Sequence, residues 1–155
     1  MPHIRKATLR DAVRVAPLLR QADRDECLAF LGLPPELILP INISQSDDTW
    51  AMVNDDGEPF GLFGVSPVHT FPEVGIVWMC STPELVRYKR ELIQQAPEVL
   101  NRLHARYPLL TNHIDARNKA HIQWLKRMGF SFLRELPEFG VEKRPFYEFA
   151  RLKCV

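Results

Sequence analysis

The sequence predicts an α/β fold in which a central mixed β-sheet is flanked by helices. Segments with strand and helix patterns follow the order β-α-α-β-β-β-α-β-α-β-β, and strand–helix–strand units alternate late in the chain. The stretch VGIVWMC, residues 74–80, is a continuous apolar run of strand length. Such runs are typical of a central strand that is buried on both faces.

Length and composition predict one globular domain spanning residues 1–155. Hydrophobic residues make up 46% of the chain and charged residues 25%, which are ordinary values for a soluble domain. The formal charge of +1 gives no overall attraction to nucleic acid or to a membrane surface. Cys27, Cys80 and Cys154 are widely spaced, which argues against a disulfide framework and fits a reducing compartment. No stretch has the pattern of a signal peptide or of a transmembrane helix, so we expect no membrane-spanning segment.

The first third of the chain is expected to hold one strand and two helices. Thr8 and Asp11 have the spacing of a capping box at the start of the first helix, which Pro17 should kink or end. The second helix is expected to end at Gly32. An irregular connection is then expected over residues 33–48.

The remaining segments predict a hairpin followed by alternating helices and strands. The turn NDDG supplies the Asp-Gly pair that hairpins favour, and Pro97 should interrupt the long helix that follows. Strands are expected at 49–53, 59–65, 74–80, 109–115, 130–136 and 145–152, and helices at 81–107 and 118–128.

The element order and several motifs resemble the acyl-CoA N-acyltransferase superfamily, the GCN5-related acetyltransferases (GNAT). HIRKATLRDAVRVAPLL is similar to the first strand and helix of that family, NDDGEPFGLFGV to its second hairpin, and NKAHIQWLKRMGF to its late Asn-to-Gly-Phe helix motif. The resemblance spans nearly the whole chain. It implies a GNAT-like fold and acetyl-CoA or another acyl-CoA as the donor.

A narrower resemblance rests on RQADRDECLAFLGLPPELIL, VWMCSTPEL, YPLLTNHIDARNKAHIQWLKRMGF and FYEF. These stretches are similar to phage-encoded proteins of this fold, a group that includes small internal virion proteins of short-tailed phages. Those proteins are packaged in the head and ejected on infection. The resemblance implies a bacteriophage protein located in the virion interior, in the host bacterial cytoplasm, or in both.

Active members of the superfamily wrap the CoA pyrophosphate with a glycine-rich loop after the central strand. The equivalent stretch here, CSTPELVRYKREL, contains no glycine, although three basic residues in its second half could compensate. Ser81 and Glu84 predict a capping box with Pro83 in its first turn. The cap would consume N–H groups that a phosphate needs, and Glu84 would place negative charge beside it.

Four residues are the expected cofactor contacts. Met79 and Cys80 would pair with the pantetheine arm through their backbone, and Ser81 follows them at the end of the strand. The resemblance implies that Asn118 contacts the CoA arm. The alternative for Asn118 is an N-cap whose side-chain oxygen accepts a hydrogen bond from the N–H near His121.

The helix that follows Asn118 contains the position at which the resemblance implies a catalytic acid. Helical spacing places His121, Trp124 and Leu125 on one apolar face, so His121 is expected to be buried, with a catalytic role as the alternative. The resemblance implies a proton-donating tyrosine at the position of Leu125. Leucine cannot donate a proton, so the usual acid is missing.

Glu26 and Asp115 are the candidate catalytic bases. Glu26, like Asp25, lies in the region that builds the acceptor side in the superfamily, and a raised pKa would let such a carboxylate deprotonate an amine. Asp115 alternates with His113 along one strand, so both could line the same cleft. For each carboxylate the alternative is a solvent-facing charge.

Three functions remain open. The first is an internal virion or ejected protein with degenerate or absent transferase activity, whose partners are other virion proteins. The second is an active acetyl-CoA-dependent N-acetyltransferase that modifies an amine of a host protein or a small molecule. The third is a non-catalytic module that binds a host protein. No histidine and cysteine spacing predicts a metal site, and no basic patch interleaved with aromatic residues predicts nucleic-acid binding.

Overall fold

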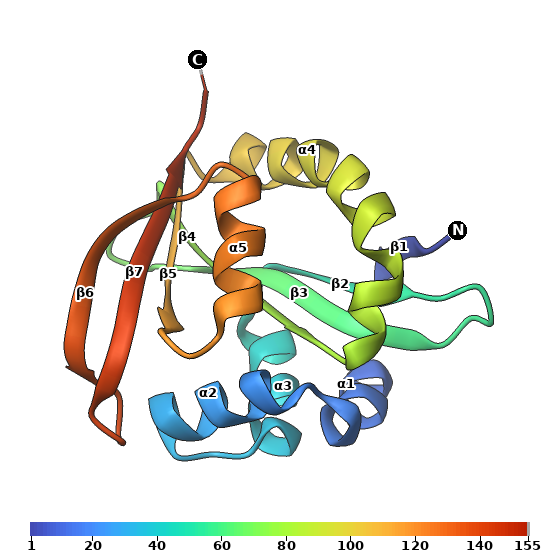
Figure 1. Ribbon diagram of the computed structural model, residues 1–155. Coiled ribbons are helices and arrows are strands. Elements are labelled where there is room, and N and C mark those ends of the chain that lie inside the picture. The colour runs from blue at the N-terminus through green and yellow to red at the C-terminus, as the bar shows by residue number, and fades with distance from the viewer. Residues whose placement is uncertain (155) are drawn as a thin grey trace.

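The computed structural model describes residues 1–154, which form one seven-stranded sheet with helices on both sides (Figure 1). The strands are β1 (His3–Lys6), β2 (Asp48–Val53), β3 (Pro59–Pro67), β4 (Val74–Ser81), β5 (Leu109–Asp115), β6 (Ser131–Phe139) and β7 (Arg144–Leu152). The α-helices are α1 (Leu9–Val15), α2 (Gln21–Leu31), α3 (Pro35–Gln45), α4 (Lys89–Arg106) and α5 (Lys119–Arg127), and the 3-10 helices are η1 (Ala16–Leu18) and η2 (Pro83–Tyr88). The predicted mixed sheet flanked by helices is confirmed.

The sheet divides where its two parallel strands meet. Its order is β1-β2-β3-β4-β5-β7-β6, and every neighbouring pair except β4 and β5 is antiparallel. β4 and β5 pair only from Val74 opposite Leu109 to Ile76 opposite Thr111. Beyond that point both strands continue without pairing to each other, so the sheet opens between their carboxyl ends.

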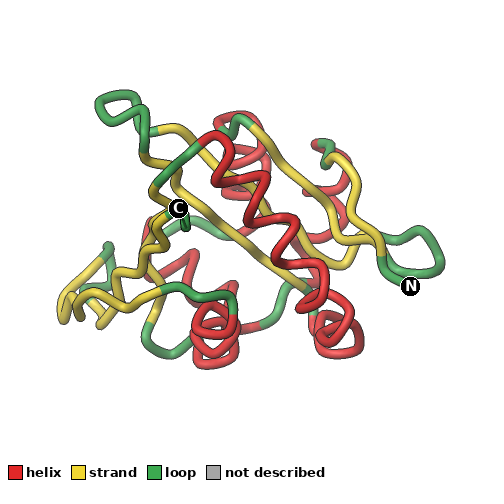
Figure 2. The backbone as a smooth tube through the Cα atoms, turned by 90° about the horizontal axis from the view of Figure 1, so that it is seen from above, coloured by secondary structure: helices red, strands yellow, loops and turns green. Residues whose placement is uncertain are grey.

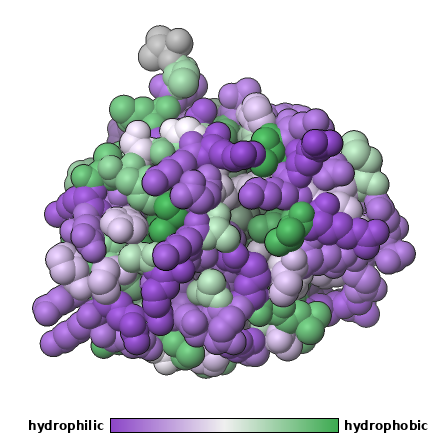
Figure 3. Space-filling view, viewed as in Figure 1, coloured by the Kyte–Doolittle hydropathy of each residue, from purple (hydrophilic) through white to green (hydrophobic). Residues whose placement is uncertain are grey.

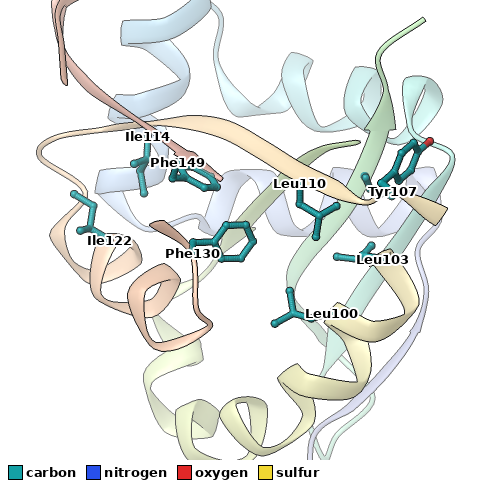
Figure 4. Close-up of a cluster of buried hydrophobic side chains, with 9 residues drawn as sticks. Leu100, Leu103, Tyr107, Leu110, Ile114, Ile122, Phe130 and Phe149 are labelled. Atoms are coloured by element: carbon teal, nitrogen blue, oxygen red, sulfur yellow. The ribbon is translucent and has the colours of Figure 1, made fainter. Parts of the chain in front are cut away.

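Two helical layers cover the sheet (Figure 2). Ala12 and Val15 of α1 and Leu39 of α3 pack against Ala51 and Leu62 on one face. On the other face, α4 and α5 contribute to a core cluster drawn in Figure 4, which consists of Val65, Leu100, Leu103, Tyr107, Leu110, Ile114, Ile122, Phe130 and Phe149. Fully burying one such side chain contributes about 1.5–3 kcal/mol, so this cluster anchors both helices to the sheet.

The N-terminal predictions are partly confirmed. Thr8 caps α1 in a capping box with Asp11, and α1 ends at Val15 ahead of Pro17. The irregular connection predicted for residues 33–48 is wrong, because most of it forms α3. Pro35 occupies the first turn of that helix, where proline is tolerated, and the side chains of Ile38 and Leu39 are buried.

The predicted break at Pro97 is also wrong. α4 runs unbroken through Pro97, and the irregularity lies earlier, where η2 gives way to α4 after Tyr88. Pro97 is exposed, while Leu92 and Ala96 before it and Leu100 after it are buried. Apolar packing on both sides of the proline offsets its missing N–H.

The β6–β7 hairpin closes over the end of α2. The N–H of Val141 donates to the Phe30 carbonyl at 3.2 Å, and the N–H of Glu142 donates to the Ala29 carbonyl at 3.2 Å. Gly140 has a φ of +75°, and a Cβ there would lie 2.3 Å from the Ala29 carbonyl oxygen. Only glycine allows this close approach of the two segments.

Within residues 1–154, no single helix is long and apolar enough to cross a membrane. Together α2 and α3 have the length and composition of a span, but they meet at an angle of 75°.

Candidate active site

A cavity of about 440 Å³ lies where β4 and β5 separate. Residues of α2 and α3 line it from one side of the sheet, and residues of α4 and α5 line it from the other. In Figure 1, α5 lies in front of the opening, and the surface on this side is mostly hydrophilic (Figure 3). The cavity walls are mostly apolar, so ligand atoms that enter it are withdrawn from water.

The predicted contacts Met79 and Cys80 line this cavity, and both are partly exposed. They pair with Phe63 and Leu62 of β3 on one edge of β4. Within residues 1–154 the other edge has no strand partner after Ile76, but two of its residues are held by side chains or by α2. The side-chain amide of Asn112 donates to the Val77 carbonyl at 2.6 Å, and the start of α2 binds the backbone of Ser81. An unpaired strand edge can accept an extended amide-bearing chain such as pantetheine.

Ser81 is held by the start of α2. Its N–H donates to Asp23 Oδ2 at 3.0 Å, and its carbonyl accepts from the N–H of Arg20 at 3.0 Å. The predicted cap at Ser81 is therefore wrong. Thr82 is the N-cap of η2, and its hydroxyl accepts from the N–H of Glu84 at 3.3 Å. The side-chain oxygen of Ser81 is buried and has no partner within the described part of the chain.

The backbone from Ser81 to Leu85 does not fit a pyrophosphate. The N–H of Thr82 donates to the Phe60 carbonyl at 2.8 Å, and the N–H of Leu85 donates to the Thr82 carbonyl at 3.2 Å. Pro83 has no N–H, and those of Ser81 and Glu84 are used as described. No N–H of this turn is left to bind phosphate oxygens, so the turn lacks the backbone donors that a pyrophosphate needs.

Asn118 occupies the N-cap position of α5, but its side chain does not cap that helix. Its Oδ1 accepts from Arg20 Nη2 at 3.0 Å, and its Nδ2 donates to Asp23 Oδ1 at 3.1 Å. The predicted bond from the N–H near His121 is therefore wrong. Asn118 is 1% exposed, and its side chain joins α5 to α2.

His121 lines the cavity and is buried, as predicted. Its Nδ1 lies 3.4 Å from Asp23 Oδ1, and its Nε2 is buried without a partner among residues 1–154. Burial lowers the pKa of His121 to about 4, although the charge of Asp23 acts in the opposite direction. The neutral ring therefore donates from Nδ1 to Asp23 and presents an Nε2 lone pair.

Glu26 also lines the cavity, where it is the one Asp, Glu, Lys or Arg among the lining residues. Its Oε1 accepts from the N–H of Asp115 at 2.8 Å. Part of the residue reaches the surface, yet its carboxyl is packed so closely that burial raises the pKa of Glu26 to about 8. A carboxyl with this pKa can exchange protons near neutral pH.

The other carboxylates predicted for the site have structural partners. Asp115 is 1% exposed and does not line the cavity. Its Oδ2 accepts from Arg117 Nη2 at 2.7 Å, and its Oδ1 accepts from the Arg117 N–H at 2.9 Å. Asp25 accepts from Gln21 at 2.8 Å. Of the strand neighbours, His113 lines the cavity and lies 3.4 Å from a Glu148 oxygen.

Sequence reasoning missed the roles of Arg20, Asp23 and Cys27. Arg20 is the N-cap residue of α2 and Asp23 lies in the first turn of that helix, and their ion pair is mostly buried. The thiol of Cys27 contacts that of Cys80, and this contact together with burial raises the pKa of Cys80. The Arg20–Asp23 spacing was the available signal, but a surface pair at the same spacing gives the same pattern.

No protein-family model matches the sequence, and no curated protein matches it. Solved structures do match. A GNAT-superfamily phosphinothricin acetyltransferase from Sinorhizobium meliloti, in complex with acetyl-CoA, is similar over 97% of this chain and 88% of its own, with a TM-score of 0.74 and 14% identity. The chain has the fold of the GCN5-related acetyltransferases.

Further structures with the GNAT fold agree. Ard1 from Thermoplasma volcanium has a TM-score of 0.72 and 16% identity, covering 99% of each chain. A putative acetyltransferase from Acinetobacter baylyi has a TM-score of 0.74 and 14% identity, covering 99% of this chain and 93% of its own. At these identities the likeness establishes the fold, and function has to be argued from the site.

Proposed function

We propose that this protein transfers an acyl group from an acyl-CoA thioester to an amine, with Glu26 as the proton-transfer group. The observation that carries the proposal is the single carboxyl in an apolar cavity at the opening between β4 and β5. A GNAT fold supplies the context, and the raised pKa of Glu26, about 8, suits a group that must both accept and release a proton.

The reaction balances with this one carboxyl. The amine nitrogen attacks the thioester carbonyl, a C–N bond forms, and the Glu26 carboxylate takes the proton that the nitrogen loses. The C–S bond then breaks, and the thiolate leaves with a proton from Glu26 or from water. Glu26 would therefore donate the proton that a tyrosine supplies in the superfamily. Leu125, at the position of that tyrosine, also lines the cavity but has no acidic proton.

The donor would be held by its pantetheine arm. The free edge of β4 supplies the backbone groups of Met79, since those of Cys80 face β3, whereas the turn from Ser81 to Leu85 offers none to the pyrophosphate. Asn118 is already occupied by Arg20 and Asp23, so we assign it to positioning. Because the turn from Ser81 to Leu85 has no free N–H for the pyrophosphate, we expect the ADP part of CoA to contribute little to the binding affinity.

The decisive experiment compares Glu26→Gln with Asp25→Asn. Acetyl transfer to a panel of primary amines is measured by mass spectrometry of the products. We expect E26Q to lower kcat by about 100-fold, the usual contribution of a general base, and D25N to change it less than about threefold. Equal rates for E26Q and the parent protein would overturn the assignment.

Two features favour a second function: the N–H groups of the turn after β4 are all hydrogen-bonded within the protein, and Leu125 cannot donate a proton. Both features fit a phage internal virion protein that has lost transferase activity and acts on other virion proteins or a host protein. Calorimetry that detects no acetyl-CoA binding at millimolar concentration, together with mass-spectrometric detection of the protein inside purified phage particles, would favour this function. Absence from the particles with specific capture of one host protein would favour a host-binding module.

A further inference from the structure

We infer that the acceptor is a monoamine with an aromatic or arylalkyl body, and that Phe30 forms part of its binding wall. This inference rests on the proposed function, because it names the substrate class of the same cavity. Its evidence is independent of the donor site: it comes from the charge, the aromatic geometry and the closure of the cavity on the α2 side.

The first argument is charge. On the α2 and α3 side the lining includes Phe30, Leu31 and Ile38, and the facing strands add Ile76, Trp78 and Phe146. Glu26 is the sole side chain of the Asp, Glu, Lys and Arg group among all residues that line the cavity. One carboxyl pairs with one amine, so a diamine or polyamine would bring a second ammonium that finds no partner in an apolar wall.

The second argument is the shape of the wall. Phe30 stacks on Phe139 with ring centroids 5.4 Å apart and an interplanar angle of 17°, and His113 stacks on the same ring at 4.5 Å and 26°. Phe146 lies 5.0 Å from Phe139. Three of these four rings, those of Phe30, His113 and Phe146, line the cavity. Planar walls of this kind favour flat apolar ligands through ring contacts.

The third argument is closure. The β6–β7 hairpin bonds to the carbonyls of Ala29 and Phe30, so it covers the end of α2 and holds Phe139 against Phe30. Phe30 remains 37% exposed, which places its ring between the cavity and solvent. A small amine can enter the cavity past the Phe30 ring. A lysine on a folded protein would instead bring its polar backbone against the aromatic rings of this wall, which is unfavourable.

The test compares 2-phenylethylamine with 1,4-diaminobutane. Acetylation of each amine is followed by mass spectrometry, and binding of each amine alone is followed by ligand-observed NMR. We expect kcat/KM for 2-phenylethylamine to exceed that for 1,4-diaminobutane by at least about 30-fold, equivalent to about 2 kcal/mol at 1.4 kcal/mol per factor of ten. Phe30→Ala should raise KM for 2-phenylethylamine about tenfold without changing KM for acetyl-CoA.

The control is Phe71→Ala, which removes an exposed ring that does not line the cavity and should leave both constants unchanged. Binding of 2-phenylethylamine that F30A weakens, without turnover of any amine, supports a binding site for arylalkylamines at Phe30 and overturns the proposed transferase. Turnover of 1,4-diaminobutane in preference to 2-phenylethylamine supports the transferase and overturns the inference. Neither binding nor turnover of 2-phenylethylamine also overturns it.

Discussion

Asp23 Oδ2 accepts a hydrogen bond from the backbone N–H of Ser81 at 3.0 Å, so a carboxylate on α2 fixes the end of β4. The same carboxylate binds Arg20 at 2.9 Å and Asn118 at 3.1 Å. One buried side chain therefore joins α2, β4 and α5 around the cavity. This network uses the Ser81 N–H and the Asn118 amide, which the sequence alone assigns to a cofactor.

Asp23→Asn should destabilise the fold strongly. The change leaves the mostly buried Arg20 guanidinium without its counter-charge, and breaking one partner of a buried pair costs about 3–5 kcal/mol. Urea unfolding followed by circular dichroism measures the loss. Asp25→Asn is the matched control on the same helix, and we expect it to stay within about 0.5 kcal/mol of the parent protein. A loss below about 1 kcal/mol for D23N would contradict the assigned role.

His121 should make the protein less stable in acid. Its folded-state pKa is about 4 against an ordinary value of 6.5, so the unfolded chain binds a proton first and stability falls as the pH drops from 6.5 through 4. The full effect is roughly 3 kcal/mol, at about 1.4 kcal/mol per pKa unit. His121→Gln should flatten this part of the curve, whereas His69→Gln, at an exposed histidine, should not.

Glu26 should give the acyl-transfer rate a pH dependence. Its pKa of about 8 means that the carboxylate form is scarce at pH 6, so the ratio of kcat/KM between the parent protein and E26Q, in which the titration of the amine itself cancels, should rise about tenfold per pH unit and level off above pH 8. Stability should move in the opposite direction. The folded state keeps the proton longer than the unfolded chain does, so stability falls as the pH rises from 4.5 through 8. A stability curve that E26Q leaves unchanged would be evidence against the raised pKa.

Gly140→Ala should loosen the hairpin from α2. The new Cβ would meet the Ala29 carbonyl at 2.3 Å and the residue would keep a φ of +75°, so we expect a loss of about 1–3 kcal/mol. Gly57→Ala separates the two causes, because Gly57 has a φ of +81° and no atom of the described residues within 4 Å of its Cβ position. A larger loss for G140A than for G57A, measured by urea unfolding, isolates the close approach. Equal losses would assign the whole effect to backbone strain.

The three thiols should differ in reactivity. Cys154 is exposed and should react first with iodoacetamide, since the accessible thiolate is the nucleophile. The thiol of Cys80 should react slowly, because its contact with Cys27 and its burial raise its pKa. Peptide mass spectrometry over a time course gives the order. Faster labelling of Cys80 than of Cys154 would show that the cavity is more open than described.

The sequence by itself determined the element order except for α3, the apolar central strand and the buried face of the helix after Asn118. These features depend on local periodicity and on residues close together in the chain, such as Thr8 and Asp11, which cap their own helix. Glu26 was also recognisable as a candidate, since position in a charged run and proximity to a predicted helix start are local properties. The prolines at positions 35 and 97 led to wrong predictions of irregular structure. A proline ends a helix only where the packing of neighbouring side chains does not offset its missing N–H.

Only the tertiary structure decided which side chains meet at the cavity. Ser81 and Asn118 both bind Asp23, at sequence separations of 58 and 95 residues, and no local pattern encodes contacts of that range. The raised pKa of Glu26 likewise comes first from burial beneath neighbouring elements, which residue type and spacing do not reveal. Local periodicity determines which face of a helix is apolar. Which acceptor a buried donor such as the Ser81 N–H binds depends on the elements that pack around it in the folded chain.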